Sequence, residues 1–114
     1  MIWDAGNLAI VESEGQTTNP GTTNVMADTG ALDGGNYEVR ALVGASAAAT
    51  FALQRRNAAN DGNVGDVPVL YVVAGSSAQF TLRYRVEAGE RIRLMMHAAL
   101  TGTAAAALNV EKMT

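Results

Sequence analysis

The side chains in this sequence that could carry out a reaction are few and scattered. His97 is the only histidine and cysteine is absent, so thiol nucleophiles, disulfides and thiolate or paired-histidine metal sites are excluded. His97 would have to be the base for any serine nucleophile, and the candidates are Ser46, Ser76 and Ser77. Two of these serines follow Gly75, which is typical of a turn and not of a strained nucleophile elbow. We therefore predict no catalytic residue and no enzymatic activity.

Acidic side chains offer two further chemistries. Several glutamates lie at expected turns and exposed strand positions: Glu12, Glu14, Glu87, Glu90 and Glu111. No two of them stand out as the acid and base of a glycosidase, although the sequence leaves open a pairing in space. Asp61, Asn63 and Asp66 are spaced so that they could present oxygen atoms to calcium. The segment lacks the terminal acidic residue of a helix–loop–helix calcium loop, and turn formation explains it equally well. We predict no metal and no cofactor, with calcium binding by residues 61–66 left as an alternative.

Trp3 is the residue that most suggests binding. It is the only tryptophan, and tryptophan is enriched at binding hot spots. With Ile2 it lies in a segment too short to form a core of its own. The segment therefore either docks on a partner or folds back onto the domain.

Charge and hydropathy narrow the range of partners. The net charge of −3 disfavours nucleic acid, which usually requires a basic surface with many phosphate contacts. Four arginines are expected to form a solvated sheet face: Arg83, Arg85, Arg91 and Arg93. Their cross-strand partners would include Glu87 and Glu90. No run approaches the roughly 20 apolar residues of a membrane helix, and the N-terminus has no signal-peptide pattern. We predict a soluble protein that binds neither nucleic acid nor membrane.

Period-two alternation predicts the elements that position these side chains. Apolar and polar residues alternate over 79–86 and again over 91–96, and a glycine-containing turn at 87–90 separates the two runs. This pattern predicts an antiparallel hairpin with one face in a core. The nearly continuous apolar run 67–73 predicts a strand that is covered on both faces.

The whole chain is expected to form one all-β domain. Its 114 residues, 48% of them hydrophobic and 17% charged, suit a single globular unit. Residues 1–36 are expected to hold an N-terminal arm, a first strand at 8–12 and loops, including a loop or arm over 13–24. Residues 37–114 are expected to form the main part of the domain. About eight short strands separated by turns predict an antiparallel β-sandwich of the jelly-roll type.

Two stretches of the sequence resemble a known superfamily. Residues 35–39 with 53–57, and residues 80–94, resemble strand-and-turn patterns of the tumour necrosis factor-like jelly roll. Within that group, residues 47–60 and 90–93 look like small virion proteins of tailed bacteriophages, above all the capsid decoration (cement) proteins. The resemblance covers roughly Tyr37 onward.

This resemblance implies a structural protein of the virion. Such a protein would be a homotrimer on the outer surface of an icosahedral phage head, assembled in the host cytoplasm. It would bridge subunits of the major capsid protein and stabilise the shell. The capsid-binding arm would use Ile2, Trp3, Leu8 and Ile10. The trimer interface would use Leu42, Tyr71 and Arg83.

The alternative is a jelly-roll module of a tail fibre or surface appendage that binds carbohydrate or a host receptor. That function favours exposed aromatic residues in loops. Most aromatic residues of this chain fall within expected strands, which disfavours the alternative at the level of sequence. An enzyme on the same scaffold is disfavoured further because histidines and carboxylates are not clustered.

Overall fold

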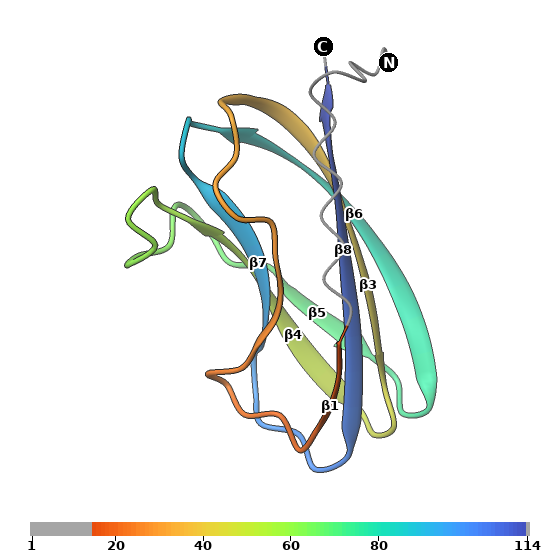
Figure 1. The fold of residues 1–114 in the computed structure, drawn as a ribbon. Helices are drawn as coiled ribbons and strands as arrows, with labels where there is room; N and C mark the ends of the chain where they lie inside the picture. Colours follow the sequence, from red (N-terminus) through yellow and green to blue (C-terminus); the bar gives the residue numbers. More distant parts are fainter. Residues whose placement is uncertain (1–14, 114) are drawn as a thin grey trace.

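Two four-stranded antiparallel sheets make up the part of the chain that the computed structural model describes, residues 15–113 (Figure 1). Sheet A has the strand order β1-β8-β3-β6, and sheet B has the order β2-β7-β4-β5. The strands are β1 (Gly15–Thr18), β2 (Val25–Asp28), β3 (Gly35–Ala45), β4 (Ala49–Arg56), β5 (Val69–Val72), β6 (Ser76–Val86), β7 (Arg91–Met96) and β8 (Thr103–Met113). Except for β4 and β5, which are consecutive, neighbouring strands come from separate parts of the chain, as in a jelly roll. The predicted all-β sandwich of about eight strands is confirmed.

The hydrophobic core fills the space between the two sheets. Alternate residues of each strand point inward, so residues 37–43 and 49–53 each have one buried side. The largest fully buried side chains include Tyr37, Phe51, Leu53, Ile92, Leu94 and Leu108. Burial of each large apolar side chain stabilises the fold by about 1.5–3 kcal/mol. Within residues 15–113, no helix is long and apolar enough to cross a membrane.

The expected hairpin between residues 79–86 and 91–96 is wrong. Strand β6 pairs with β3 in sheet A, whereas β7 pairs with β2 and β4 in sheet B. Residues 87–90 therefore carry the chain from one sheet to the other. Gly89 adopts a φ of +90°, and Glu90 accepts a hydrogen bond from the backbone N–H of Glu87 at 2.8 Å. Alternation correctly indicated that one face is buried, but it does not identify the pairing partner.

The expected burial of residues 67–73 on both faces is also wrong. Strand β5 lies at the edge of sheet B and pairs only with β4. Leu70 and Val72 point into the core, whereas Val69, Tyr71 and Val73 are 48%, 58% and 61% exposed. A continuous apolar run therefore marks an edge strand here, not a central one.

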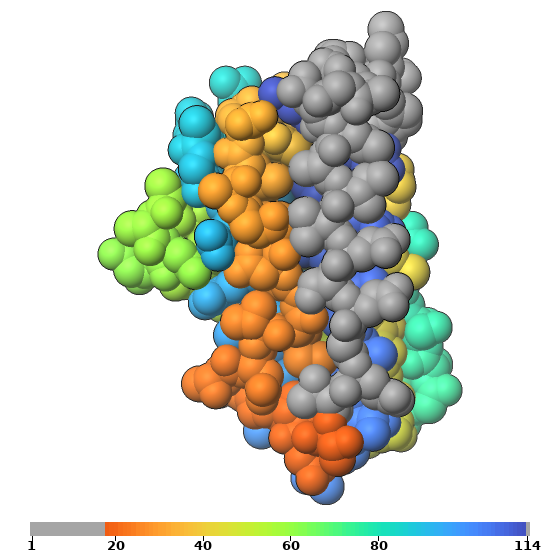
Figure 2. Space-filling model, in the orientation of Figure 1, coloured from red at the N-terminus to blue at the C-terminus, as the bar shows by residue number. Residues whose placement is uncertain are grey.

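The N-terminal third contributes a strand to each sheet. Strand β1 falls within the expected loop or arm at 13–24 and pairs with residues 103–106 of β8. Strand β2 pairs with β7 in sheet B. The strand expected at 8–12 lies outside the described residues. Figure 2 shows the loop between β4 and β5 standing out from the body of the sandwich.

Candidate ligand-binding face

The outer face of sheet B presents a row of side chains along β4. Thr50, Ala52, Gln54 and Arg56 alternate with core residues, so they point away from the core. The register places Thr50 opposite Tyr71 of β5, Ala52 between Val69 and Met95, and Gln54 opposite Arg93 of β7. The face therefore has an aromatic end near Tyr71 and a basic end near Arg93, with the small Ala52 between them.

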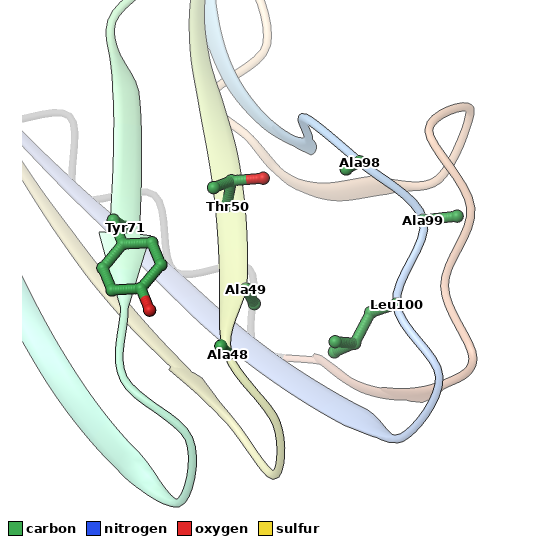
Figure 3. A pocket seen from close by; sticks show the side chains of 7 residues that line it. All are labelled: Ala48, Ala49, Thr50, Tyr71, Ala98, Ala99 and Leu100. Atoms are coloured by element: carbon green, nitrogen blue, oxygen red, sulfur yellow. The ribbon is translucent and has the colours of Figure 1, made fainter.

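A hollow of about 90 Å³ lies at the aromatic end (Figure 3). Tyr71 borders it from β5, Thr50 from β4, and Leu100 from the segment that follows β7. The remaining lining residues are small, and they leave the space open: Ala48, Ala49, Ala98 and Ala99. The backbone N–H of His97 donates to the carbonyl of Thr50 at 2.9 Å, which ties this segment to β4. An exposed aromatic ring thus stands beside a hydroxyl group and a cavity.

Three arginines of β4 and β7 lie at the basic end. Arg93 Nε donates to Gln54 Oε1 at 2.6 Å, and Arg91 forms an ion pair with Asp28 of β2 at 3.2 Å. Arg56 donates to Asn63 Oδ1 at 2.9 Å and to Asn60 Oδ1 at 3.0 Å. Burial lowers the pKa of Arg93, and the charges of Arg56 and Arg91 lower it further, while Asp28 acts in the opposite direction.

The outer face of sheet A carries an ion-pair network centred on Arg40. Its guanidinium contacts Glu111 at 2.7 Å and Glu38 at 3.1 Å, and Arg83 approaches Glu38 at 3.6 Å. Burial opposes the charge of Arg40, but the hydrogen bonds that Arg40 donates to Glu111 and Glu38 outweigh it and raise the pKa of Arg40. The two glutamates are direct neighbours across β3 and β8, a pairing that the sequence alone did not reveal. A shared arginine makes them a structural cluster and not an acid–base pair.

The residues predicted for a trimer interface lie on two opposite faces. Leu42, 38% exposed, and Arg83 are on the outer face of sheet A, on the neighbouring strands β3 and β6. Tyr71 is on the outer face of sheet B. The predicted capsid-binding residues, Ile2, Trp3, Leu8 and Ile10, lie outside the described residues.

The single arginine strip expected from the sequence does not form. Because the chain changes sheets at residues 87–90, β6 and β7 place their arginines on opposite faces of the sandwich. Arg83 pairs with Glu38 and Arg91 pairs with Asp28, in place of the expected Glu87 and Glu90.

The remaining candidates for chemistry form hydrogen bonds within turns or between connecting segments. Ser46 Oγ accepts a hydrogen bond from the N–H of Thr103 at 2.9 Å, and Ser76 Oγ donates to the carbonyl of Val73 at 2.7 Å. In the loop 57–66, Asp61 Oδ1 accepts from Asn57 Nδ2 at 2.7 Å. Across residues 15–113, no three or more His, Cys, Asp or Glu side chains are grouped to hold a metal ion.

Comparison with known proteins connects this chain only to solved structures. No family model matches it, and no curated protein does. It is similar to the CBM22-1 and GH10 modules of Clostridium thermocellum endo-1,4-beta-D-xylanase 10B complexed with xylohexaose (TM-score 0.62, 18% identity, 94% of this chain and 24% of that chain). This chain thus spans about a quarter of that xylanase chain.

Two further solved structures are also similar to this chain. One is the CBM22-1 xylan-binding domain of Paenibacillus barcinonensis Xyn10C (TM-score 0.56, 18% identity, 85% of this chain and 70% of that chain). The other is Eiger TNF from S. frugiperda (TM-score 0.54, 14% identity, 89% and 85%). The fold is a jelly roll. These similarities establish the shared architecture. The similarity to Eiger TNF agrees with the expected tumour necrosis factor-like jelly roll.

Proposed function

We propose that this chain is a non-catalytic carbohydrate-binding module whose ligand lies on the outer face of sheet B. The observation that carries the proposal is Tyr71, an exposed aromatic side chain beside a hollow on a sheet that also presents polar groups. An aromatic ring offers an apolar surface to the C–H groups of a sugar, while nearby polar side chains fix its hydroxyl groups. The xylan-binding domain and the xylohexaose complex named above lend support through their shared fold.

The dimensions of the face suit an oligosaccharide. The span from Thr50 to Gln54 covers five residues of β4, or four steps of ~3.3 Å, about 13 Å in all. The hollow of about 90 Å³ accommodates only part of a ligand, so most of the contact would be made on the open face. Ala52 and its neighbour Met95 are buried (5% and 7% exposed), so a sugar chain stacked on Tyr71 would pass over them and make its polar contacts at Gln54 and Arg93.

Calorimetric titration with xylohexaose and with acidic oligosaccharides tests this proposal. Tyr71→Ala should weaken binding at least about tenfold, equivalent to ~1.4 kcal/mol, while Tyr71→Phe should retain most of it because the ring remains. Leu42→Ala, an apolar truncation on the opposite outer face, is the matched control and should have no effect. The proposal is wrong if the wild-type chain binds none of these ligands, or if Tyr71→Ala binds them normally.

A trimeric decoration protein of a phage capsid is the second proposal. It would sit on the outer surface of the virion, contact the major capsid protein through Ile2, Trp3, Leu8 and Ile10, and assemble in the host cytoplasm. The exposed apolar side chains of Val69, Tyr71 and Val73 at an edge strand favour an interface of this kind. A threefold ring joins two different surfaces of each subunit, which suits Leu42 and Arg83 on one face and Tyr71 on the other.

A further inference from the structure

The outer face of sheet B has an uneven distribution of charge. Arg56 and Arg91 are directly opposite each other on β4 and β7, an arrangement of like charges that is unfavourable in a sheet. Arg93 lies on the same face of β7, two residues further along. Among residues 15–113, the carboxylate that contacts this group is Asp28, which pairs with Arg91. Three positive charges therefore lie beside one negative charge.

The hydrogen-bond partners leave part of this charge uncompensated. Arg93 donates to the neutral amide oxygen of Gln54, and Arg56 donates to the neutral amide oxygens of Asn60 and Asn63. Arg91 Nε is buried and has no hydrogen-bond partner among the described residues. The outer face of sheet A differs, because Arg40 and Arg83 there contact two carboxylates. An anion at the basic end of sheet B would supply the missing negative charge.

Guanidinium groups match planar anionic groups particularly well. Arginine binds a carboxylate through two parallel N–H donors, and it also binds sulfate-like oxygens. Resting on the carbohydrate-binding function proposed above, we propose that the ligand is an acidic oligosaccharide. One of its sugars stacks on Tyr71, and an anionic group of another sugar contacts Arg93 and its neighbours Arg56 and Arg91. The anionic group is a uronate carboxylate or a sulfate ester.

Calorimetry at low ionic strength compares four probes: an oligogalacturonate, its methyl ester, a sulfated galactan oligosaccharide and neutral xylohexaose. The oligogalacturonate or the sulfated probe should bind about tenfold or more tightly than the neutral ligands, and added salt should reduce that difference. If the oligogalacturonate binds best, the anionic group is a carboxylate, and the methyl ester should lose the advantage. If the sulfated probe binds best, the group is a sulfate ester.

Variants assign the preference to this group of arginines. Arg93→Gln should reduce affinity for the acidic probe to that of the neutral ligand, and Arg93→Lys should recover only part of it, since lysine lacks the paired donors. Arg85→Gln on β6 of sheet A removes the same charge elsewhere and should leave the preference intact. Thermal unfolding of each variant checks that it is folded, and Arg56→Gln provides a second substitution in the group.

The outcomes separate this inference from the function on which it rests. Equal binding of neutral and acidic probes, with Tyr71→Ala still disruptive, overturns the acidic ligand and leaves carbohydrate binding in place. A preference for acidic probes that Arg93→Gln and Arg56→Gln leave unchanged also overturns the inference. If no probe binds the wild-type chain, both proposals fail.

Discussion

Individual side chains make the two outer faces of the sandwich chemically different. On sheet A, Arg40 and Arg83 contact Glu38 and Glu111, so the two positive charges of this network are balanced by two negative ones. On sheet B, Arg93 and Arg56 are held by neutral amide oxygens, and Tyr71 is exposed. A face whose charges are already paired offers little to a charged ligand. Sheet B is therefore the face on which we place ligand binding.

At the same scale, Tyr37 should make stability fall at alkaline pH. Its ring is buried, and its hydroxyl donates to the carbonyl of Asp33 at 2.7 Å. Burial, with a smaller effect from the charge of Asp33, raises the pKa of Tyr37 above its ordinary value of 10.0. As the pH rises through 10.0, the unfolded chain loses this proton while the folded chain keeps it, so the free energy of unfolding decreases. That contribution is complete below pH 10.0 and is lost as the pH passes through the higher folded-state value.

Urea unfolding measured across this alkaline range tests the prediction. Tyr37→Phe should lower stability at neutral pH by about 1 kcal/mol through the lost hydrogen bond, and it should show a shallower alkaline decline. Tyr84→Phe should also flatten the decline, because burial raises the pKa of Tyr84 despite the opposing charge of Arg55. An alkaline decline as steep in both variants as in the wild type would contradict this assignment.

At the scale of elements, the sequence predicted which face of each strand is buried better than it predicted the partner of each strand. The alternation of Tyr37, Val39 and Ala41 correctly indicated an inward row of β3. The same pattern in β6 and β7 suggested a hairpin, because alternation has a period of two whether or not consecutive strands pair. The exposure of Tyr71 depends on β5 being an edge strand, which is a property of the strand order and not of the local sequence.

The connection before β8 depends on a glycine with a defined conformation. Gly102 has a φ of +132°, and a Cβ atom there would collide with Ser46 Oγ, which accepts a hydrogen bond from Thr103. Gly75 also has a positive φ, of +69°, but a Cβ atom there would meet no other atom within 4 Å. Gly102→Ala should destabilise the fold by about 2–4 kcal/mol, whereas Gly75→Ala should cost about 1–2 kcal/mol.

Chemical denaturation of the two alanine variants measures the difference. Both substitutions place a side chain at a positive φ, but +132° is adopted almost only by glycine whereas +69° lies in the left-handed region, so the excess cost at Gly102 combines backbone strain with the collision with Ser46. Removing the Ser46 side chain should relieve the collision. The Gly102→Ala, Ser46→Gly double variant should therefore lose less stability than the sum of the losses in the two single variants. Equal costs at the two glycines would show that Ser46 moves aside freely.

At the scale of the whole molecule, the two proposed functions place opposite demands on Tyr71. Carbohydrate binding requires its ring to be free, whereas a trimer contact would bury it together with Val69 and Val73. We expect native mass spectrometry to give the mass of a single chain, and Tyr71→Ala to remove ligand binding without changing that mass. Val73→Lys, which places a charge directly after the same edge strand, should leave both properties unchanged because the hollow does not include Val73. A trimer that Tyr71→Ala or Val73→Lys dissociates would favour the decoration protein, since the same edge strand would then be the subunit contact.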